Sequence, residues 1–503
     1  MKSATIRQKE IKRLKESNMA KFCGIVGLAL ICGSFFAGVG FANQQKSSDP
    51  NQPAGAEPIS PDKLKENLWR YPQESWFMYA RPEEAGWSSK KLEEARNYFE
   101  KLDSTAIMVI YNGAVVIAWG DIERRYMCHS IRKSYLSALY GIHVDQGNID
   151  LNKTLAELNI DDNPPLTDAE KQAKVVNLLK SRSGVYHNAS CESDDMVKYR
   201  PKRGSHAPGE FFWYNNWGFN ALATIFEQET GTKIFEEFKK NISDPLEMQD
   251  FQLLHTFYDF EPDRSIHPGY CFRMSARDMA RFGLLFLRKG KWNNQQIISE
   301  KWVSESTSSP SIFRGSHISD GYGYMWWVCN SGSFKGGSMY SARGTCGHSI
   351  RVLPTENIVY VHRVNTYGWE KVSRHVNPVD QVKLLNMILD AKTSGSKSNP
   401  VMIPLPQVPK RTDIINLNPS VLDKYVKEYE GENLKIRVKK IEGNLLIDYK
   451  KGKFRLLPLS KSRFIMEDVE TPIFFELDNK GNPLSVTLEF KSGQKFYGKS
   501  VCY

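Results

Sequence analysis

Apolar positions along the chain follow a strand pattern early, a helical pattern next and a strand pattern again late. Two apolar runs, residues 106–111 and 114–119, flank Asn112-Gly113, a dipeptide typical of a tight type I′ turn, and predict a β-hairpin. Residues 130–146 then show helical spacing, with a glycine as stop signal. Further helices are expected over 168–180, 217–229, 234–240, 275–288 and 378–391, and short strands over 324–329, 349–353 and 358–364. Helices between early and late strands, without regular alternation, favour an α+β class.

The last hundred residues change to short alternating segments separated by Gly and Asn turns. Residues 393–410 are rich in Pro and Ser and predict a linker. Beyond it we expect a helical turn or two over 420–429 and then strands over 434–440, 445–449, 454–457, 473–477, 484–490 and 494–498. Residues 411–503 are therefore predicted to form a small antiparallel β-domain.

The N-terminal segment has the layout of a targeting signal. No charged residue occurs over 22–42, a lysine precedes this stretch, and residues 40–42 (GFA) suit a signal peptidase. Residues 1–42 are expected to be a signal peptide or, if uncleaved, a membrane anchor, and the polar residues 43–67 a tether. The domain that follows, residues 68–392, would then be exported to the periplasm or secreted, with a membrane contact only through the N-terminal segment.

Composition and charge argue against three classes of protein. Of the 503 residues, 41% are hydrophobic and 25% charged, which argues against wholesale disorder and against a polytopic membrane protein. The net charge of +11 comes mostly from the ends of the chain: residues 1–42 carry seven basic and two acidic side chains, and residues 401–503 carry 18 and 13. The long middle segment is nearly neutral and has no basic run, so no nucleic-acid partner is expected.

The spacing of cysteine and histidine supports no metal site. The sequence contains no CxxC, HExxH or His-x-His cluster, and neither a metal nor an organic cofactor is expected. Export would place six cysteines of the mature chain in an oxidising compartment, where their pairing stays open. They are Cys128, Cys191, Cys271, Cys329, Cys346 and Cys502.

The candidate nucleophile comes from the pattern Ser-x-x-Lys, which occurs five times. Only Ser130 opens a largely apolar helix directly after the predicted hairpin; the other four serines lie in linkers, a strand turn or an exposed helix. Three residues apart on a helix, Ser130 and Lys133 share a face, and the helix N-terminus stabilises negative charge on the hydroxyl. Burial of the lysine would lower its pKa and leave a neutral amine to take the hydroxyl proton. The alternative is a helix-capping serine followed by a solvated lysine.

A second group that handles the proton is expected in the pattern Tyr-x-Asn. It occurs at Tyr186/Asn188 and at Tyr214/Asn216. The second pair directly precedes a predicted helix, and a loop at that place can face the cleft beside the Ser–Lys pair. Tyr214 and Asn216 are therefore the favoured candidates, against the alternative of an aromatic wedge with an asparagine cap.

Taken in order, these motifs resemble the serine β-lactamase-related family, in the class C-like branch that includes penicillin-binding D-peptidases, esterases and 6-aminohexanoate-oligomer hydrolases. The segments that carry the resemblance are 128–134 (CHSIRKS), 178–184 (LLKSRSG), 208–216 (PGEFFWYNN), 275–283 (SARDMARFG), 292–302 (WNNQQIISEKW) and 322–327 (YGYMWW). The resemblance covers roughly residues 70–390 and implies an antiparallel sheet flanked by helices with an all-α region. The last hundred residues resemble, less specifically, the small lipocalin-like β-domain that often follows such catalytic domains.

One motif departs from the β-lactamase form, which has Lys-Thr-Gly on the strand that lines the cleft. The corresponding stretch, 341–348 (SARGTCGH), is similar to the Gly-x-x-Gly-Gln variant of the oligomer-hydrolase branch, with His348 in place of glutamine. By this resemblance the backbone N–H of Thr345, beside Gly344, shares the oxyanion hole with the N–H of the nucleophile. Arg343 and His348 are candidate substrate-binding residues. The missing lysine argues against β-lactamase and D-peptidase activities.

The resemblance implies an exported serine hydrolase that cleaves an ester or amide bond of a small or short peptide-like substrate through an acyl-enzyme. Ser130 would attack the carbonyl, Lys133 and Tyr214 would carry its proton to the leaving group, and Asn216 would orient the lysine and the substrate. Two alternatives stay open. One is a penicillin-interacting D-peptidase or β-lactamase, and the other is a non-catalytic cell-envelope binding protein on the same scaffold.

Overall fold

The computed structural model describes residues 70–316, 319–330, 336–367, 374–409, 411–449, 452–490 and 492–501. The expected signal peptide, the tether and Cys502 lie outside these residues. Within the described part of the chain, no helix is long and apolar enough to cross a membrane. The five cysteines that the structure describes are free thiols.

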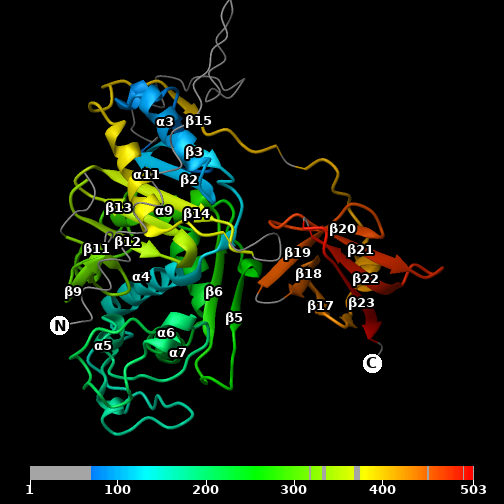
Figure 1. Ribbon diagram of the computed structural model, residues 1–503, viewed down its shortest axis with the longest axis horizontal. Coiled ribbons are helices and arrows are strands. Elements are labelled where there is room, and N and C mark those ends of the chain that lie inside the picture. Colours follow the sequence, from blue (N-terminus) through cyan, green and yellow to red (C-terminus); the bar gives the residue numbers. More distant parts are fainter. Residues whose placement is uncertain are drawn as a thin grey trace, which may run out of the picture. The chain divides into compact units, whose positions relative to one another are not determined.

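The first domain is built on a ten-stranded mixed sheet (Figure 1). Its predicted hairpin is confirmed as β2 (Ser104–Tyr111) and β3 (Ala114–Gly120), and Asn112 and Gly113 have the positive φ values, 54° and 91°, that a type I′ turn requires. On the β3 side lie β1 (Phe77–Tyr79) and β15 (Met402–Pro404). On the β2 side follow β14 (Ile358–Val364), β13 (Ser349–Leu353), β12 (Met339–Arg343), β11 (Trp327–Cys329), β10 (Ser319–Tyr322) and β9 (Ser311–Ser316).

Helices cover both faces of this sheet. α3 (Ser89–Phe99) and α11 (Pro378–Asp390) pack together over one face, where the odd-numbered side chains of β2 point. α9 (Ala276–Leu287) packs against the other face, over the even-numbered side chains of the same strand. Because successive residues of a strand point to opposite faces, a strand covered on both sides is apolar throughout, as β2 is.

A mainly helical region surrounds α4 (Arg132–Asp145), which is buried along almost its whole length. α4 contacts α7 (Asn216–Thr230) and α8 (Ile234–Phe238), and α7 also contacts α5 (Val175–Leu179). The remaining helices and a two-stranded ribbon are α6 (Asp194–Lys198), α10 (Glu300–Ser306), β7 (Lys291–Trp292) and β8 (Gln295–Gln296). Because α4 is buried along almost its whole length, it has no polar face.

A small three-stranded sheet feeds the chain into α4. Its strands, in the order β4, β6, β5, are β4 (Tyr126–Met127), β6 (Gly269–Met274) and β5 (Thr256–Asp259). β4 pairs with β6 through Tyr126 opposite Met274 and Met127 opposite Arg273. After β4 only a short turn separates the chain from α4, so the position of β4 determines where α4 begins.

Two predicted elements are shorter than expected. The helix expected over 168–180 is a 3-10 turn, Glu170–Gln172, followed by α5, because Lys174 between them is extended and bridges to Thr154. The strand expected over 324–329 is only β11, because Met325 has a φ of 62° that turns the chain just before it. In both places a single residue whose backbone leaves the predicted conformation interrupts the expected element.

The C-terminal residues form a closed eight-stranded antiparallel barrel. Its strands are β16 (Glu428–Gly431), β17 (Leu434–Ile441), β18 (Asn444–Tyr449), β19 (Gly452–Pro458), β20 (Arg463–Met466), β21 (Thr471–Leu477), β22 (Pro483–Glu489) and β23 (Lys495–Val501). The helix expected over 420–429 ends early as α12 (Pro419–Asp423), so that β16 can pair with both β17 and β23 and close the barrel. The prediction of an α+β fold with a small antiparallel β-domain is confirmed.

Candidate active site

Ser130 lies in a 3-10 turn, His129–Ile131, between β4 and α4. His129 has a left-handed φ of 49°, which turns the chain sharply just before the serine. The Nζ atom of Lys133, in the first turn of α4, lies 2.7 Å from the Oγ atom of Ser130. Lys133 is 1% exposed, whereas Ser130 is only half-buried. The structure thus brings the two predicted residues together, with the hydroxyl in front and the amine behind it.

The surroundings of Lys133 favour its neutral form. Burial lowers the pKa of its ammonium well below the usual 10.5, and the neighbouring Arg132 guanidinium lowers it further. The thiols of Cys191 and Cys271 act in the opposite direction, and among the described residues no carboxylate opposes the shift. A neutral amine at hydrogen-bond distance from a hydroxyl can accept its proton, which makes Lys133 a suitable general base.

Tyr214 lies in the loop directly before α7, close to the same lysine. Its ring centroid is 4.9 Å from the Nζ atom of Lys133. Burial raises the pKa of Tyr214 to about 12, although a side-chain hydrogen bond with Ser130 lowers it in part. The phenol therefore keeps its proton near neutral pH, so Tyr214 is suited to relay a proton rather than to hold a negative charge.

Asn216 is the first residue of α7 and is 3% exposed. Its Nδ2 atom donates a hydrogen bond of 2.5 Å to the carbonyl oxygen of Cys191. Its Oδ1 atom is buried and has no hydrogen-bond partner among the described residues. Buried acceptors are nearly always satisfied, so this oxygen is available to an N–H group of a protonated lysine or of a bound substrate.

The turn after β12 passes directly against the nucleophile. A Cβ atom on Gly344 would lie 2.6 Å from the carbonyl oxygen of Cys128 and 3.2 Å from the Cβ atom of His129. Only glycine permits this approach, and Thr345 follows it as the exposed first residue of a 3-10 turn, Thr345–Gly347. The structure therefore places the predicted second oxyanion donor on a segment that touches the Ser130 turn.

Residues 91–383 match the model of the family described as Beta-lactamase. The match covers more than half of the chain and includes every residue of the site described above. The chain belongs to the beta-lactamase family. Members of this family are serine hydrolases, and the resemblance inferred from the motifs is confirmed.

Several solved structures of the beta-lactamase family and its relatives are similar to the chain. A protein provisionally assigned as a 6-aminohexanoate-dimer hydrolase from Bacillus anthracis is 20% identical, with 59% of this chain and 80% of that one covered and a TM-score of 0.46. SurE with D-Leu is 17% identical, with 82% and 99% covered and a TM-score of 0.44. The octameric penicillin-binding protein homologue from Pyrococcus abyssi is 18% identical, with 82% and 99% covered and a TM-score of 0.45. No curated protein sequence matches the chain.

Arg343 is the last residue of β12, next to Gly344 and Thr345. Its guanidinium carbon lies 5.1 Å from the ring centroid of Trp327, and its Nε atom donates a hydrogen bond of 3.0 Å to the hydroxyl of Ser341. Burial, helped by Arg351, lowers the pKa of Arg343 to about 9, so the side chain stays cationic at neutral pH. Its part in substrate binding stays a prediction.

His348 lies in the interior, behind the turn that carries Thr345. The side chain is 1% exposed, and neither ring nitrogen has a hydrogen-bond partner among the described residues. Its ring centroid is 5.3 Å from that of His129. Burial lowers the pKa of His348 well below 6.5, with Arg363 adding to the effect, so the ring is neutral. Contact of His348 with substrate stays a prediction.

The structure adds groups that the sequence patterns did not single out as site residues. The rings of Tyr214 and Tyr322 lie 5.1 and 5.0 Å from Trp327, and Phe212 lies 5.4 Å from Tyr322. With Tyr214, the predicted residue whose ring lies beside Lys133, the side chains of Phe212, Tyr322 and Trp327 form an aromatic wall. The run of aromatic residues at 322–327 was a signal for it, but nothing local to Cys191 shows that its carbonyl holds Asn216.

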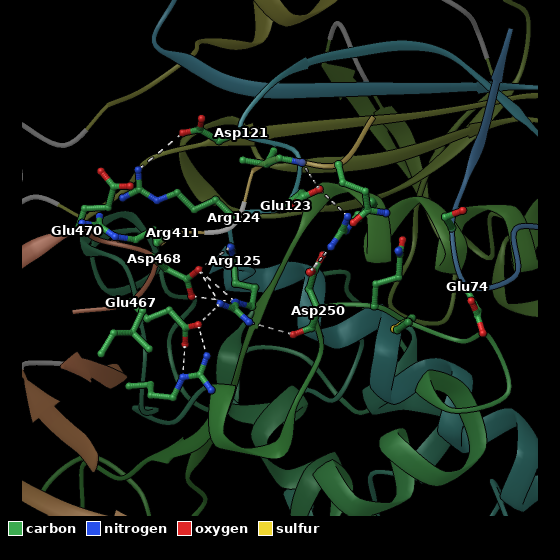
Figure 2. A pocket seen from close by; sticks show the side chains of 18 of the residues that line it. Glu74, Asp121, Glu123, Arg124, Arg125, Asp250, Arg411, Glu467, Asp468 and Glu470 are labelled. Atoms are coloured by element: carbon green, nitrogen blue, oxygen red, sulfur yellow. Dashed lines mark hydrogen bonds and ion pairs between the residues drawn. The ribbon is translucent and has the colours of Figure 1, made fainter. Parts of the chain in front are cut away.

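A pocket of about 1790 Å³ lies away from Ser130, between the β4–β6 region and the barrel (Figure 2). Three possible metal ligands are grouped here, with the ligand atoms of His255, Glu467 and Asp468 within 4.8 Å of one another. The two carboxylates already bind guanidinium groups: Glu467 pairs with Arg125 and Arg455, and Asp468 pairs with Arg125 and Arg273. A metal ion bound to these carboxylates would leave the arginines without acidic partners. The group is therefore better described as an ion-pair network.

Proposed function

We propose that this protein is an exported serine hydrolase that cleaves an ester or amide bond through an acyl-enzyme on Ser130. The single observation that carries the proposal is the 2.7 Å distance between the Nζ atom of a buried Lys133 and the Oγ atom of a half-exposed Ser130. A serine hydroxyl is a weak nucleophile until a nearby base takes its proton. The neutral amine favoured at Lys133 supplies this base.

In the acylation step, the Oγ atom of Ser130 bonds to the substrate carbonyl carbon while its proton moves to the Nζ atom of Lys133. The negative charge that develops on the carbonyl oxygen is received by the backbone N–H groups of Ser130 and Thr345. Tyr214 then gives its proton to the leaving alkoxide or amine and takes one from Lys133. The bond from the carbonyl carbon to the leaving group breaks, and the acyl-enzyme remains.

In the deacylation step, a water molecule attacks the same carbonyl carbon. Tyr214 accepts the proton of the water while its own proton moves to Lys133, because a phenol with a pKa of about 12 does not persist as a phenolate near neutral pH. The ester bond to Ser130 then breaks, the serine regains its proton and the acid is released. The orphan Oδ1 atom of Asn216 holds an N–H group of Lys133 or of the substrate in place during both steps.

The substrate part of the proposal rests on the aromatic wall and on Arg343. The wall offers an apolar surface beside the nucleophile, and the cationic Arg343 at its edge suits a polar or anionic group of a small or short peptide-like substrate. The alternative within the same chemistry is a penicillin-interacting D-peptidase or β-lactamase, which would form a stable adduct with penicillin or hydrolyse it.

Labelling with a fluorophosphonate tests the proposal. In this reaction the Oγ atom of Ser130 bonds to phosphorus, fluoride leaves, and Lys133 takes the proton. We expect mass spectrometry to place one label on Ser130 in the wild-type chain and none in Ser130→Ala. Ser394→Ala is the matched control, because Ser394 also begins a Ser-x-x-Lys pattern but lies in the linker. An unlabelled wild-type chain, with ligand binding that survives in Ser130→Ala, would favour a binding protein instead.

Export is part of the same proposal and rests on the sequence of residues 1–42 alone. Expression of the full chain followed by fractionation tests it. A mature protein outside the cytoplasm whose N-terminus begins near residue 43 supports cleavage, and a full-length chain in the membrane fraction supports an anchor. A full-length chain in the cytoplasm contradicts both.

A further inference from the structure

The strand that leads to the nucleophile is held by the barrel. Arg125 precedes β4 and lies five residues before Ser130. Its Nε atom donates to both carboxylate oxygens of Asp468 at 3.1 and 3.0 Å, its Nη2 atom donates at 3.0 Å, and its backbone N–H donates at 3.4 Å. Asp468 belongs to the turn between β20 and β21 of the barrel, and Figure 2 shows it against Arg125. Several bonds thus join one barrel carboxylate to the start of the nucleophile strand.

The same carboxylate also holds the partner strand. The Nη2 atom of Arg273, on β6, donates to Asp468 at 2.5 Å, and its Nη1 atom donates to the carbonyl oxygen of Lys453 at 2.5 Å. The guanidinium carbon of Arg273 lies 4.2 Å from the ring centroid of Phe454 in the barrel. Since Arg273 pairs directly with Met127 of β4, Asp468 fixes both sides of the β4–β6 pair.

Only four residues separate this clamp from Ser130, and hydrogen bonds hold the backbone of this segment at two of them. The carbonyl oxygen of Tyr126 accepts a hydrogen bond of 2.6 Å from Arg363, and the backbone N–H of Cys128 donates one of 2.9 Å to Phe272. His129 then makes the left-handed turn. A segment of four residues held in this way cannot absorb movement at Arg125. A displacement of Arg125 is therefore passed on to Ser130.

Lys133 is anchored differently, because α4 packs against α7, α8 and α10 as well as against β6. Movement of β4 therefore changes the position of the Oγ atom of Ser130 relative to the Nζ atom of Lys133 and to the N–H group of Thr345. Misplacement of a reacting group by about 1 Å can cost about 10²-fold in rate.

We propose that Asp468 is a positioning residue: a carboxylate supplied by the barrel holds Arg125 and Arg273, and through them the strand that presents Ser130. The barrel is then a component of the catalytic unit rather than an accessory domain. This inference rests on the proposed function, since it assigns Asp468 a part in the reaction of Ser130.

The experiment compares full-length wild-type protein with Asp468→Asn and Asp468→Glu. Asp448→Asn is the matched control, because it removes a barrel carboxylate that pairs only with Lys439 among the described residues. For each protein we measure the second-order rate constant of fluorophosphonate labelling, kcat and KM with a p-nitrophenyl ester, and the Tm. In Asp468→Asn we expect labelling and kcat to fall about tenfold or more while KM changes less than twofold. Asp468→Glu, which keeps the charge but moves the oxygens, should be intermediate, and the control should match wild type.

Each outcome either supports or overturns the positioning role of Asp468. A folded Asp468→Asn that is labelled at the wild-type rate overturns the positioning role, as does a rate loss that only follows the fraction of unfolded protein at the assay temperature. If Asp468→Asn does not fold, Asp468→Glu decides alone, and a wild-type labelling rate in it overturns the inference. A wild-type chain that takes no label contradicts the proposed function itself, whereas equal labelling of wild type and variant contradicts only the role of Asp468.

Discussion

Two of the places where this protein buries basic side chains shift the pKa of the buried group in opposite directions. At the nucleophile, Lys133 meets a second cation and aromatic rings but no described carboxylate, and its pKa falls. At the barrel interface, burial alone would lower the pKa of Arg125, but Asp468 and Glu467 raise it above its usual value. Without an acidic partner, the buried Lys133 is suited to act as a base. With acidic partners, the buried Arg125 keeps its charge and holds its neighbours in place.

The difference also explains which residue type stands at each place. A lysine shifts its pKa readily when buried and can work in the neutral form, which proton transfer requires. An arginine keeps its charge and offers several N–H donors, so that Arg125 can bind two carboxylates and a backbone carbonyl at once. Substitutions that change the charge or the acidic partners one at a time test this difference.

The largest effect is expected for Lys133→Arg, which keeps a cation but cannot supply a neutral amine. We expect kcat for a p-nitrophenyl ester to fall by about 10²–10⁴-fold. Lys91→Arg, at another Ser-x-x-Lys pattern on the exposed surface of α3, is the control and should leave kcat unchanged. If Lys133→Arg were as active as wild type, Lys133 would not be the general base.

The next effect concerns the oxyanion donor. Thr345→Pro removes the backbone N–H together with the threonine side chain, and Gly344 before it is already extended with a ψ of 157°, which a following proline requires. We expect kcat to fall about 10²–10³-fold. Thr345→Ala keeps the N–H and should retain most of the activity, so equal losses in both variants would argue against this donor.

The ion-pair network at the barrel predicts an effect on stability rather than on proton transfer. The nearby His255, whose Nε2 atom lies 3.9 Å from the carboxylate, and the charges of Arg125 and Arg455 outweigh burial and hold the pKa of Glu467 below its usual 4.5. The stabilisation is therefore present above about pH 4.5 and is lost as the pH falls through the lower folded-state pKa. Glu467→Gln should reduce the free energy of unfolding by about 1–3 kcal/mol at pH 7.

Thermal unfolding across pH measures this difference. The gap in Tm between wild type and Glu467→Gln should narrow below pH 4.5, because the carboxyl of the unfolded wild-type chain then takes up a proton while the folded carboxyl stays charged until its lower pKa is reached. A gap that stays constant with pH would assign the loss to packing rather than to charge.

The smallest effect is expected for an ion pair of the same chemistry at the surface. Lys439 and Asp448 lie on neighbouring barrel strands with 39% and 33% of their side chains exposed. Because water screens such a pair, Asp448→Asn should change the free energy of unfolding by less than about 1 kcal/mol in chemical denaturation. A loss as large as that of Glu467→Gln would show that burial is not what separates the two networks.

Sequence reasoning succeeded where the signal is local. Ser130 and Lys133 are three residues apart on a helix, and the alternation of Leu434, Ile436 and Val438 with charged residues marks a barrel strand. Local patterns also misled: the segments around Lys174 and Met325 were predicted as single elements, because neither an extended residue nor a left-handed turn leaves a mark in the pattern of apolar positions.

The interface could not be predicted in the same way. Arg125 and Asp468 are 343 residues apart, and neither stands in a recognisable motif. Only the fold brings them together, as it brings the carbonyl of Cys191 to Asn216. The basic excess of the last hundred residues gave no hint of it, because the barrel contributes carboxylates, not cations, to this contact with Arg125 and Arg273.

Gly344 has a consequence for how this protein can vary. Since any side chain at this position would collide with the carbonyl oxygen of Cys128, all nineteen substitutions share one defect, whatever their chemistry. In a library of single variants selected for activity, position 344 should be depleted of every residue but glycine. Under selection for soluble expression alone, several of these substitutions should survive. Positions depleted only under selection for activity would then include those, like 344, that serve the site by allowing close approach of the backbone rather than by reacting.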